Sequence, residues 1–115
     1  MQIPKQAVLL RIFIGEDDKA GTSPLYEAIV LKAREMHLAG ATVLRGPMGF
    51  GASSPLHTAK ILRLSEDLPL VIEIVDAEDK INGFLPTLYG MMSSGSGLIT
   101  LEKVQVLQYG TNGKS

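Results

Sequence analysis

The chain has 115 residues, of which 45% are hydrophobic and 20% charged, so its size and composition are those of one folded domain rather than a disordered segment. The absence of cysteine excludes disulfides, thiolate-bound zinc and a cysteine nucleophile, and the net charge of −1 argues against a broad nucleic-acid-binding surface. No apolar run approaches the ~20 residues that cross a bilayer, and the first six residues do not resemble a secretory signal. We therefore expect a cytoplasmic protein without direct membrane insertion, with a single domain over residues 1–110 and a flexible tail over residues 111–115.

The first half of the chain predicts a strand, a helix and a second strand. Residues 7–14 place aliphatic side chains at alternate positions, which is typical of an interior strand. Ser23 as a cap and Pro24 at the first helical position predict the start of a helix, and Gly40 is placed to end it. Residues 41–46 follow as the second strand.

The second half repeats this order. Residues 68–75 are the most apolar window and predict a strand, in which Glu73 is expected to pair with a basic group across the sheet. Asp76 is placed to cap a second helix, and Pro86 predicts that this helix bends or ends early. Residues 98–107 predict the last strand.

The order β-α-β-β-α-β predicts an α+β, ferredoxin-like fold, in which two helices cover one face of a four-stranded antiparallel sheet. The uncovered face must meet water or another subunit. Because the predicted strands are apolar on both faces, we expect the chain to form an oligomer through that face.

Residues 45–51 hold three glycines and a proline directly after the second strand. Glycines at such a position allow backbone N–H groups to approach anionic oxygens closely. The stretch lacks the Gly-Lys-Ser/Thr ending of a P-loop, and a simple glycine-rich turn explains it equally well.

Two further stretches have the composition of binding loops. Residues 52–67 form a long connection that includes Lys60 and Arg63, which are either phosphate donors or members of a solvated loop face. His57 has no evident second ligand, so no metal site is predicted. Residues 93–97 read as a flexible loop, and no acid, base or nucleophile set predicts a catalytic site.

Residues 13–16, 42–51 and 64–76 resemble the DUF190 family, and the Arg-Gly-x-x-Gly-Phe-Gly element at residues 45–51 is specific to it. The resemblance covers the chain from about residue 9 to residue 106. DUF190 is similar in fold to the PII nitrogen-regulatory signalling proteins, which are trimers whose sheets face the trimer axis. Those proteins bind adenine nucleotides in clefts between subunits, formed by the loop after the second strand and the loop before the last strand.

The resemblance implies a non-enzymatic, regulatory homotrimer that requires no cofactor and binds a small anionic ligand, with an adenine nucleotide such as AMP as the expected one. It also implies that the ligand orders a mobile loop, which controls a partner protein such as a membrane transporter or channel. Leu98 stands where PII proteins have a phosphate-binding lysine, and residues 106–108 lack their arginines. These departures favour a monophosphate or cyclic nucleotide over a polyphosphate.

The expected ligand-binding residues combine the matched loops with the end of the first strand. They are Gly15, Glu16, Arg45, Gly46, Gly49, Phe50, Gly51, Lys60, Arg63, Gly95, Gly97, Leu98 and Thr100. One alternative is an assembly trimer of the CutA type without a nucleotide, which explains the fold but leaves Arg45 and the paired glycine loops without a role. Another is an enzyme acting on a small anion in the same cleft, which the missing catalytic set disfavours.

Overall fold

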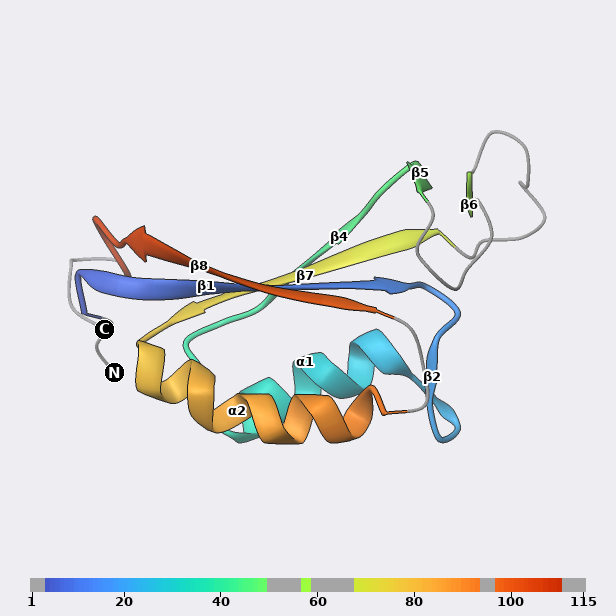
Figure 1. Cartoon of the computed structure of the whole chain (residues 1–115), viewed down its shortest axis with the longest axis horizontal. Coiled ribbons are helices and arrows are strands. Elements are labelled where there is room, and N and C mark those ends of the chain that lie inside the picture. Colours follow the sequence, from blue (N-terminus) through green and yellow to red (C-terminus); the bar gives the residue numbers. More distant parts are fainter. Residues whose placement is uncertain (1–3, 50–56, 59–67, 94–96, 111–115) are drawn as a thin grey trace.

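The computed structural model describes residues 4–49, 57–58, 68–93 and 97–110, and two helices lie side by side against one face of a sheet (Figure 1). The sheet strands are β1 (Gln6–Gly15), β4 (Thr42–Arg45), β7 (Pro69–Asp76) and β8 (Leu98–Gln105). The helices are α1 (Leu25–Glu35) and α2 (Glu78–Met91). Two small ribbons pair β2 (Lys19–Ala20) with β3 (Ser23–Pro24), and β5 (Met48–Gly49) with β6 (His57–Thr58).

The four-stranded sheet has the order β4-β7-β1-β8, and each pair of neighbours is antiparallel. This is the ferredoxin-like arrangement that the sequence predicts, and the expected fold class is confirmed. The expected tail at residues 111–115 lies outside the described residues.

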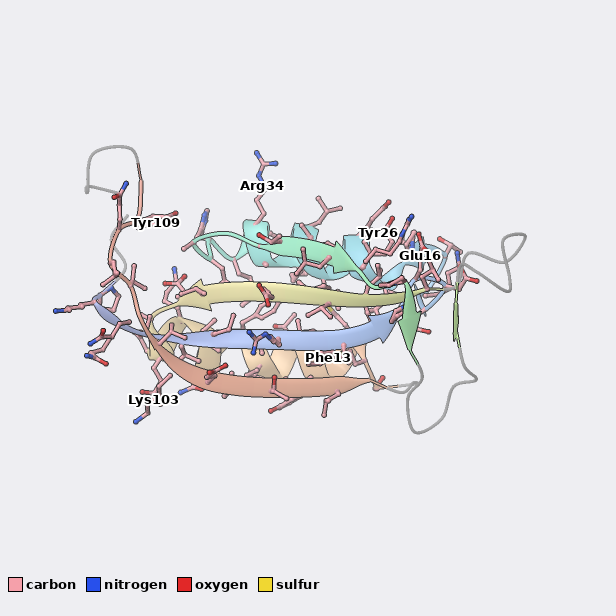
Figure 2. The ribbon with its side chains drawn as sticks, turned by 90° about the horizontal axis from the view of Figure 1, so that it is seen from above. Phe13, Glu16, Tyr26, Arg34, Lys103 and Tyr109 are labelled. Atoms are coloured by element: carbon pink, nitrogen blue, oxygen red, sulfur yellow. The ribbon has the colours of Figure 1, made fainter. Side chains whose placement is uncertain are left out.

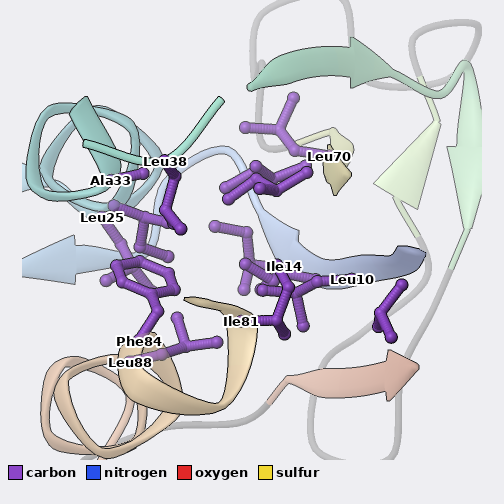
Figure 3. Close-up of a cluster of buried hydrophobic side chains, with 14 residues drawn as sticks. Leu10, Ile14, Leu25, Ala33, Leu38, Leu70, Ile81, Phe84 and Leu88 are labelled. Atoms are coloured by element: carbon purple, nitrogen blue, oxygen red, sulfur yellow. The ribbon is translucent and has the colours of Figure 1, made fainter. Parts of the chain in front are cut away.

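The core lies between the sheet and the two helices because alternate strand residues point toward the helices. β7 alternates strictly between buried and half-buried positions along its whole length. Figure 3 shows the cluster that results, in which the side chain of Phe84 on α2 lies beside Leu25 of α1. The fully buried apolar side chains are Leu10, Ile12, Ile29, Ile72, Ile74, Ile81, Phe84 and Leu88.

α2 continues through Pro86, so of the two outcomes expected there, a bend or an early end, the early end is wrong. Pro86 removes one backbone hydrogen bond, but it lies on an exposed side of the helix. Phe84 and Leu88 flank it and are both fully buried, so packing on the core side maintains the helix across the proline.

α1 ends before Gly40, and His37 instead adopts the left-handed conformation, with φ 65°. The Leu38 N–H donates to the Ala33 carbonyl at 3.0 Å, and Leu38 and Ala33 are both buried. Returning Leu38 to the core in this way sets the turn at His37, so the expected role of Gly40 is wrong.

Neither helix begins with the expected side-chain cap. Pro24 and Ala77 are the capping residues, and neither makes a side-chain cap hydrogen bond, so the assignments of Ser23 and Asp76 as caps are wrong. The carboxylate of Asp76 lies inside the protein, where it accepts the N–H of Ala77 at 2.7 Å and that of Ala39 at 2.9 Å. Asp76 therefore joins the connection after α1 to the start of α2.

Candidate functional site

Four strand ends meet at one end of the sheet, which we call the loop end. β1 and β4 finish there, and β7 and β8 begin there (Figure 1). The register places Gly15 opposite Pro69, Arg45 opposite Leu70 and Leu98 opposite Phe13. The loop end therefore gathers residues that are distant in the sequence.

Arg45 and Glu16 form an ion pair at the loop end, reaching from β4 and from the end of β1 across the intervening strand β7. The Glu16 N–H donates to the Leu68 carbonyl at 2.8 Å, and the Gly46 N–H donates to the Pro69 carbonyl at 2.8 Å. Both backbones are thus held by the start of the same strand, which fixes the distance that the two side chains must bridge.

The two partners differ in exposure. The side chain of Arg45 is 57% exposed and that of Glu16 is 15% exposed, so the guanidinium lies outside and the carboxylate inside. Glu16 accepts through Oε2 from Nη2 of Arg45, while Oε1 is buried and meets no hydrogen-bond donor among the described residues. A guanidinium has five N–H donors, so Arg45 retains donors for an outside acceptor.

Two glycines at the loop end have close neighbours. A β-carbon at Gly49 would come within 3.1 Å of the Pro69 ring. Gly97 has φ +152°, and a β-carbon there would overlap Cε of Met92 and lie 3.3 Å from the Phe13 carbonyl oxygen. The backbone conformation of residue 97 therefore favours glycine by itself, whatever binds nearby.

A single chain brings together Gly15, Glu16, Arg45 and Gly46, and Gly49 packs on the same strand start through Pro69. The edge of the sheet opposite to β4 is β8, which contains Leu98 and Thr100 and directly follows Gly97. Three strand spacings of ~4.8 Å put these two edges roughly 14 Å apart. The expected residues Phe50, Gly51, Lys60, Arg63 and Gly95 lie outside the described residues.

The sheet face without helices, here called the open face, carries a charged trio at its centre. Arg11 donates through Nε to Glu73 at 2.9 Å and through Nη1 to Glu102 at 3.0 Å. The hydrogen bond to Glu73, followed by attraction to both carboxylates, raises the pKa of Arg11 above its ordinary value. The expectation that Glu73 pairs with a basic group across the sheet is confirmed.

Apolar side chains surround this trio, because strand residues in register with one another share a face. Figure 2 views the molecule from this side, with Phe13 on β1 near the loop end. The apolar members are Leu9, Phe13, Leu44, Val71, Val75, Leu98 and Val104. Leu44 and Leu98 are 49% and 55% exposed, which is unusual for large aliphatic residues.

A hollow of about 620 Å³ lies on the open face at the end opposite to the loop end. Residues 106–109 form one wall, and the start of β4 forms another. The Tyr109 hydroxyl donates to the Ala39 carbonyl at 2.7 Å, which holds this wall in place at the end of the sheet away from Glu16 (Figure 2). The hollow was not predicted from the sequence. Tyr109 was the one residue near it whose type suggested a role, and its contact with Ala39 depends on the folded chain.

Within the described ranges, no three His, Cys, Asp or Glu side chains gather closely enough to hold a metal ion. The same part of the chain has no helix with the length and apolar character needed to cross a membrane.

The sheet order, the helices on a single face and the strand ends at the loop end define a PII-like, ferredoxin-like fold. A similar structure is that of CPII, a nitrogen regulatory PII-like protein from Thiomonas intermedia K12 bound to ADP, AMP and bicarbonate. It is 16% identical over 88% of each chain, with a TM-score of 0.69. A putative PII-like signaling protein from Thermus thermophilus is 16% identical over 92% of this chain and 93% of its own, with a TM-score of 0.65.

The chain belongs to the DUF190 family, described as "Uncharacterized ACR, COG1993", whose model matches residues 7–106. A UPF0166 protein of Aquifex aeolicus strain VF5 is 41% identical over 99 residues, which are 86% of this chain and 91% of that protein.

Proposed function

We propose that the chain is a non-enzymatic PII-like signalling protein that forms a homotrimer and binds an adenine nucleotide, with a monophosphate favoured, between subunits. A partner protein distinguishes the nucleotide-bound form from the free form. The observation that carries this proposal is the division of the loop end into two halves on opposite sheet edges. Arg45 lies on the β4 edge, where Glu16 reaches it from the end of β1, whereas Gly97 and Leu98 lie at the β8 edge. A second copy that sets its β8 edge beside β4 would unite the two halves.

The open face supports association of this kind. Half-buried apolar residues flank one charged trio there, with the exposed Leu44 and Leu98 on the two edges, and apolar surface on a small domain marks an interaction site. Packing these faces against one another removes the apolar surface from water and sets sheet edges side by side. The same geometry creates the seams in which the ligand binds.

Arg45 supports an anionic ligand. Its guanidinium is more than half exposed, and planar N–H donors match the oxygens of a phosphate. Leu98, at the start of β8, adds no charge to the other half of the seam. This favours one phosphate group over a chain of them. CPII, described as bound to ADP and AMP, is a protein of the same fold and makes an adenine nucleotide the first ligand to test.

An assembly trimer without a nucleotide is the second candidate. The observation that favours it is that Glu16 already pairs with Arg45, so the cation has a partner in the free chain. Both candidates require an oligomer, and they differ in whether Arg45 meets a ligand.

The test measures the melting temperature of the purified protein with AMP, ADP, ATP and cyclic AMP, in wild type and in two variants. A ligand that binds only the folded state raises the melting temperature. We expect a rise of several degrees that Arg45→Ala abolishes. Arg34→Ala, which removes an exposed arginine pointing outward from α1 (Figure 2), is expected to preserve it.

Light scattering on the same samples should report a trimer, and the nucleotide should be recovered unchanged after long incubation. Absence of any thermal response would leave only the assembly trimer. A monomer would contradict both candidates, and conversion of the nucleotide would show an enzyme.

A further inference from the structure

The Arg45–Glu16 pair brings a negative charge into the anion site itself. The carboxylate is the more buried partner, with exposures of 15% for Glu16 and 57% for Arg45, so an anion from solvent meets the arginine while Glu16 is bonded to it. The pair as a whole has no net charge. An anion at this position is therefore attracted by the guanidinium and repelled by the carboxylate bonded to it.

We propose that Glu16 sets the charge selectivity of this site, favouring a singly charged phosphodiester over a phosphate group with two or more negative charges. The inference rests on the proposed function, because it concerns which nucleotide the seam binds.

The argument follows from how each contribution depends on the ligand's charge. Hydrogen bonds from the outward N–H groups of Arg45 form with either kind of phosphate. Each further negative charge on the ligand, in contrast, increases both its attraction to Arg45 and its repulsion by Glu16, and the repulsion offsets the added attraction. A ligand in contact with Arg45 lies closer to this carboxylate than the ~8 Å screening length of physiological salt, so the repulsion persists. Charges beyond the first therefore add little affinity.

Glu16 cannot easily move away to relieve this repulsion. Its N–H is bonded to the Leu68 carbonyl, and its Oε1 is already buried without a donor among the described residues. Losing Arg45 would leave Oε2 without its partner beside an Oε1 that is already buried and unpaired among the described residues, which is unfavourable. The ligand must therefore share Arg45 with Glu16 rather than displace it.

A purely positioning role for Glu16 predicts the opposite result. If the carboxylate served only to hold Arg45 toward the ligand, removing its charge would weaken binding of every anion. The sign of the effect in Glu16→Gln therefore separates the two roles, because glutamine retains the shape and lacks the charge.

The experiment is titration calorimetry of the wild type and Glu16→Gln with AMP, ATP and cyclic AMP. We expect Glu16→Gln to bind AMP about tenfold more tightly, a change of about 1.4 kcal/mol, and ATP by at least as much. Cyclic AMP, with a single charge, should gain only about threefold. Glu35→Gln removes the exposed carboxylate paired with Lys32 on α1, and should remain within twofold of the wild type for all three ligands. Weaker binding of all three ligands by Glu16→Gln, or an unchanged AMP to cyclic AMP ratio, would overturn the inference.

A second measurement distinguishes failure of the inference from failure of the proposed function. The NMR signal of the Arg45 Nε–H group is followed during titration with inorganic phosphate and with dimethyl phosphate, in both proteins. If no nucleotide binds but phosphate shifts this signal at lower concentration in Glu16→Gln than in the wild type, the proposed function fails and the charge role of Glu16 holds. Identical titrations of the two proteins would refute that role. A melting temperature for each variant verifies that it is folded.

Discussion

Replacing Asp76 with asparagine tests the buried carboxylate that joins two distant connections. Asp76 is 1% exposed and accepts the N–H groups of Ala39 and Ala77 at 2.9 and 2.7 Å. Asparagine has the same shape, but its one carbonyl oxygen can accept only one of these bonds. Its NH₂ group then faces the remaining N–H. A lost charge-assisted bond and an unsatisfied buried donor together lower the free energy of unfolding by about 2–4 kcal/mol.

The assay is urea unfolding followed by circular dichroism, at one fixed protein concentration because an oligomer's stability depends on it. Asp79→Asn is the matched control, since Asp79 is exposed in the first turn of α2. Its loss removes only a favourable charge at a helix start, about 0.3–1 kcal/mol. If Asp76→Asn costs no more than Asp79→Asn, the two hydrogen bonds do not support the fold as argued.

Two predictions concern glycines. Gly83 lies in the exposed part of α2, and a β-carbon there would meet nothing within 4 Å, so Gly83→Ala should raise the unfolding free energy by about 0.5–1 kcal/mol in the same urea assay. Loss of stability would show that this face of the helix is in contact with something. Gly97→Ala should cost more than about 2 kcal/mol, because φ +152° lies in a region that only glycine adopts readily and the new β-carbon would crowd the Phe13 carbonyl oxygen at 3.3 Å. Gly21→Ala, with φ +66° and open space around it, should cost only about 1 kcal/mol. Equal melting temperatures for the two variants would contradict this backbone argument.

The sequence predicts the sheet and the position of both helices because hydrophobic periodicity reports which residues face the core. β1, β7 and the faces of their residues follow directly from alternation. Local rules failed where long-range contacts compete with them. Pro86 is tolerated because buried neighbours flank it, and α1 ends at the turn that buries Leu38 rather than at Gly40.

The candidate site is less accessible from the sequence. The end of β1 and the end of β4 are recognisable as neighbours once the fold is assumed, and the two residues Glu16 and Arg45 do pair. Their unequal exposure depends on how Leu68 and Pro69 hold both backbones, which no spacing in the sequence records. The separation of Arg45 from Gly97 follows from strand order, which is a property of the assembled sheet.

The trio of Arg11, Glu73 and Glu102 has a consequence for which surfaces can cover the open face. A sheet face with only aliphatic residues would associate nonspecifically with other apolar surfaces. Here, a covering surface must also accommodate one guanidinium and two carboxylates, with one negative charge left over. A surface that buried the trio without supplying a cation or a hydrogen-bond donor would leave one carboxylate buried and unpaired, so its binding would be unfavourable. The trio thus restricts the surfaces that can cover the open face to those that supply a cation or hydrogen-bond donors for the extra carboxylate.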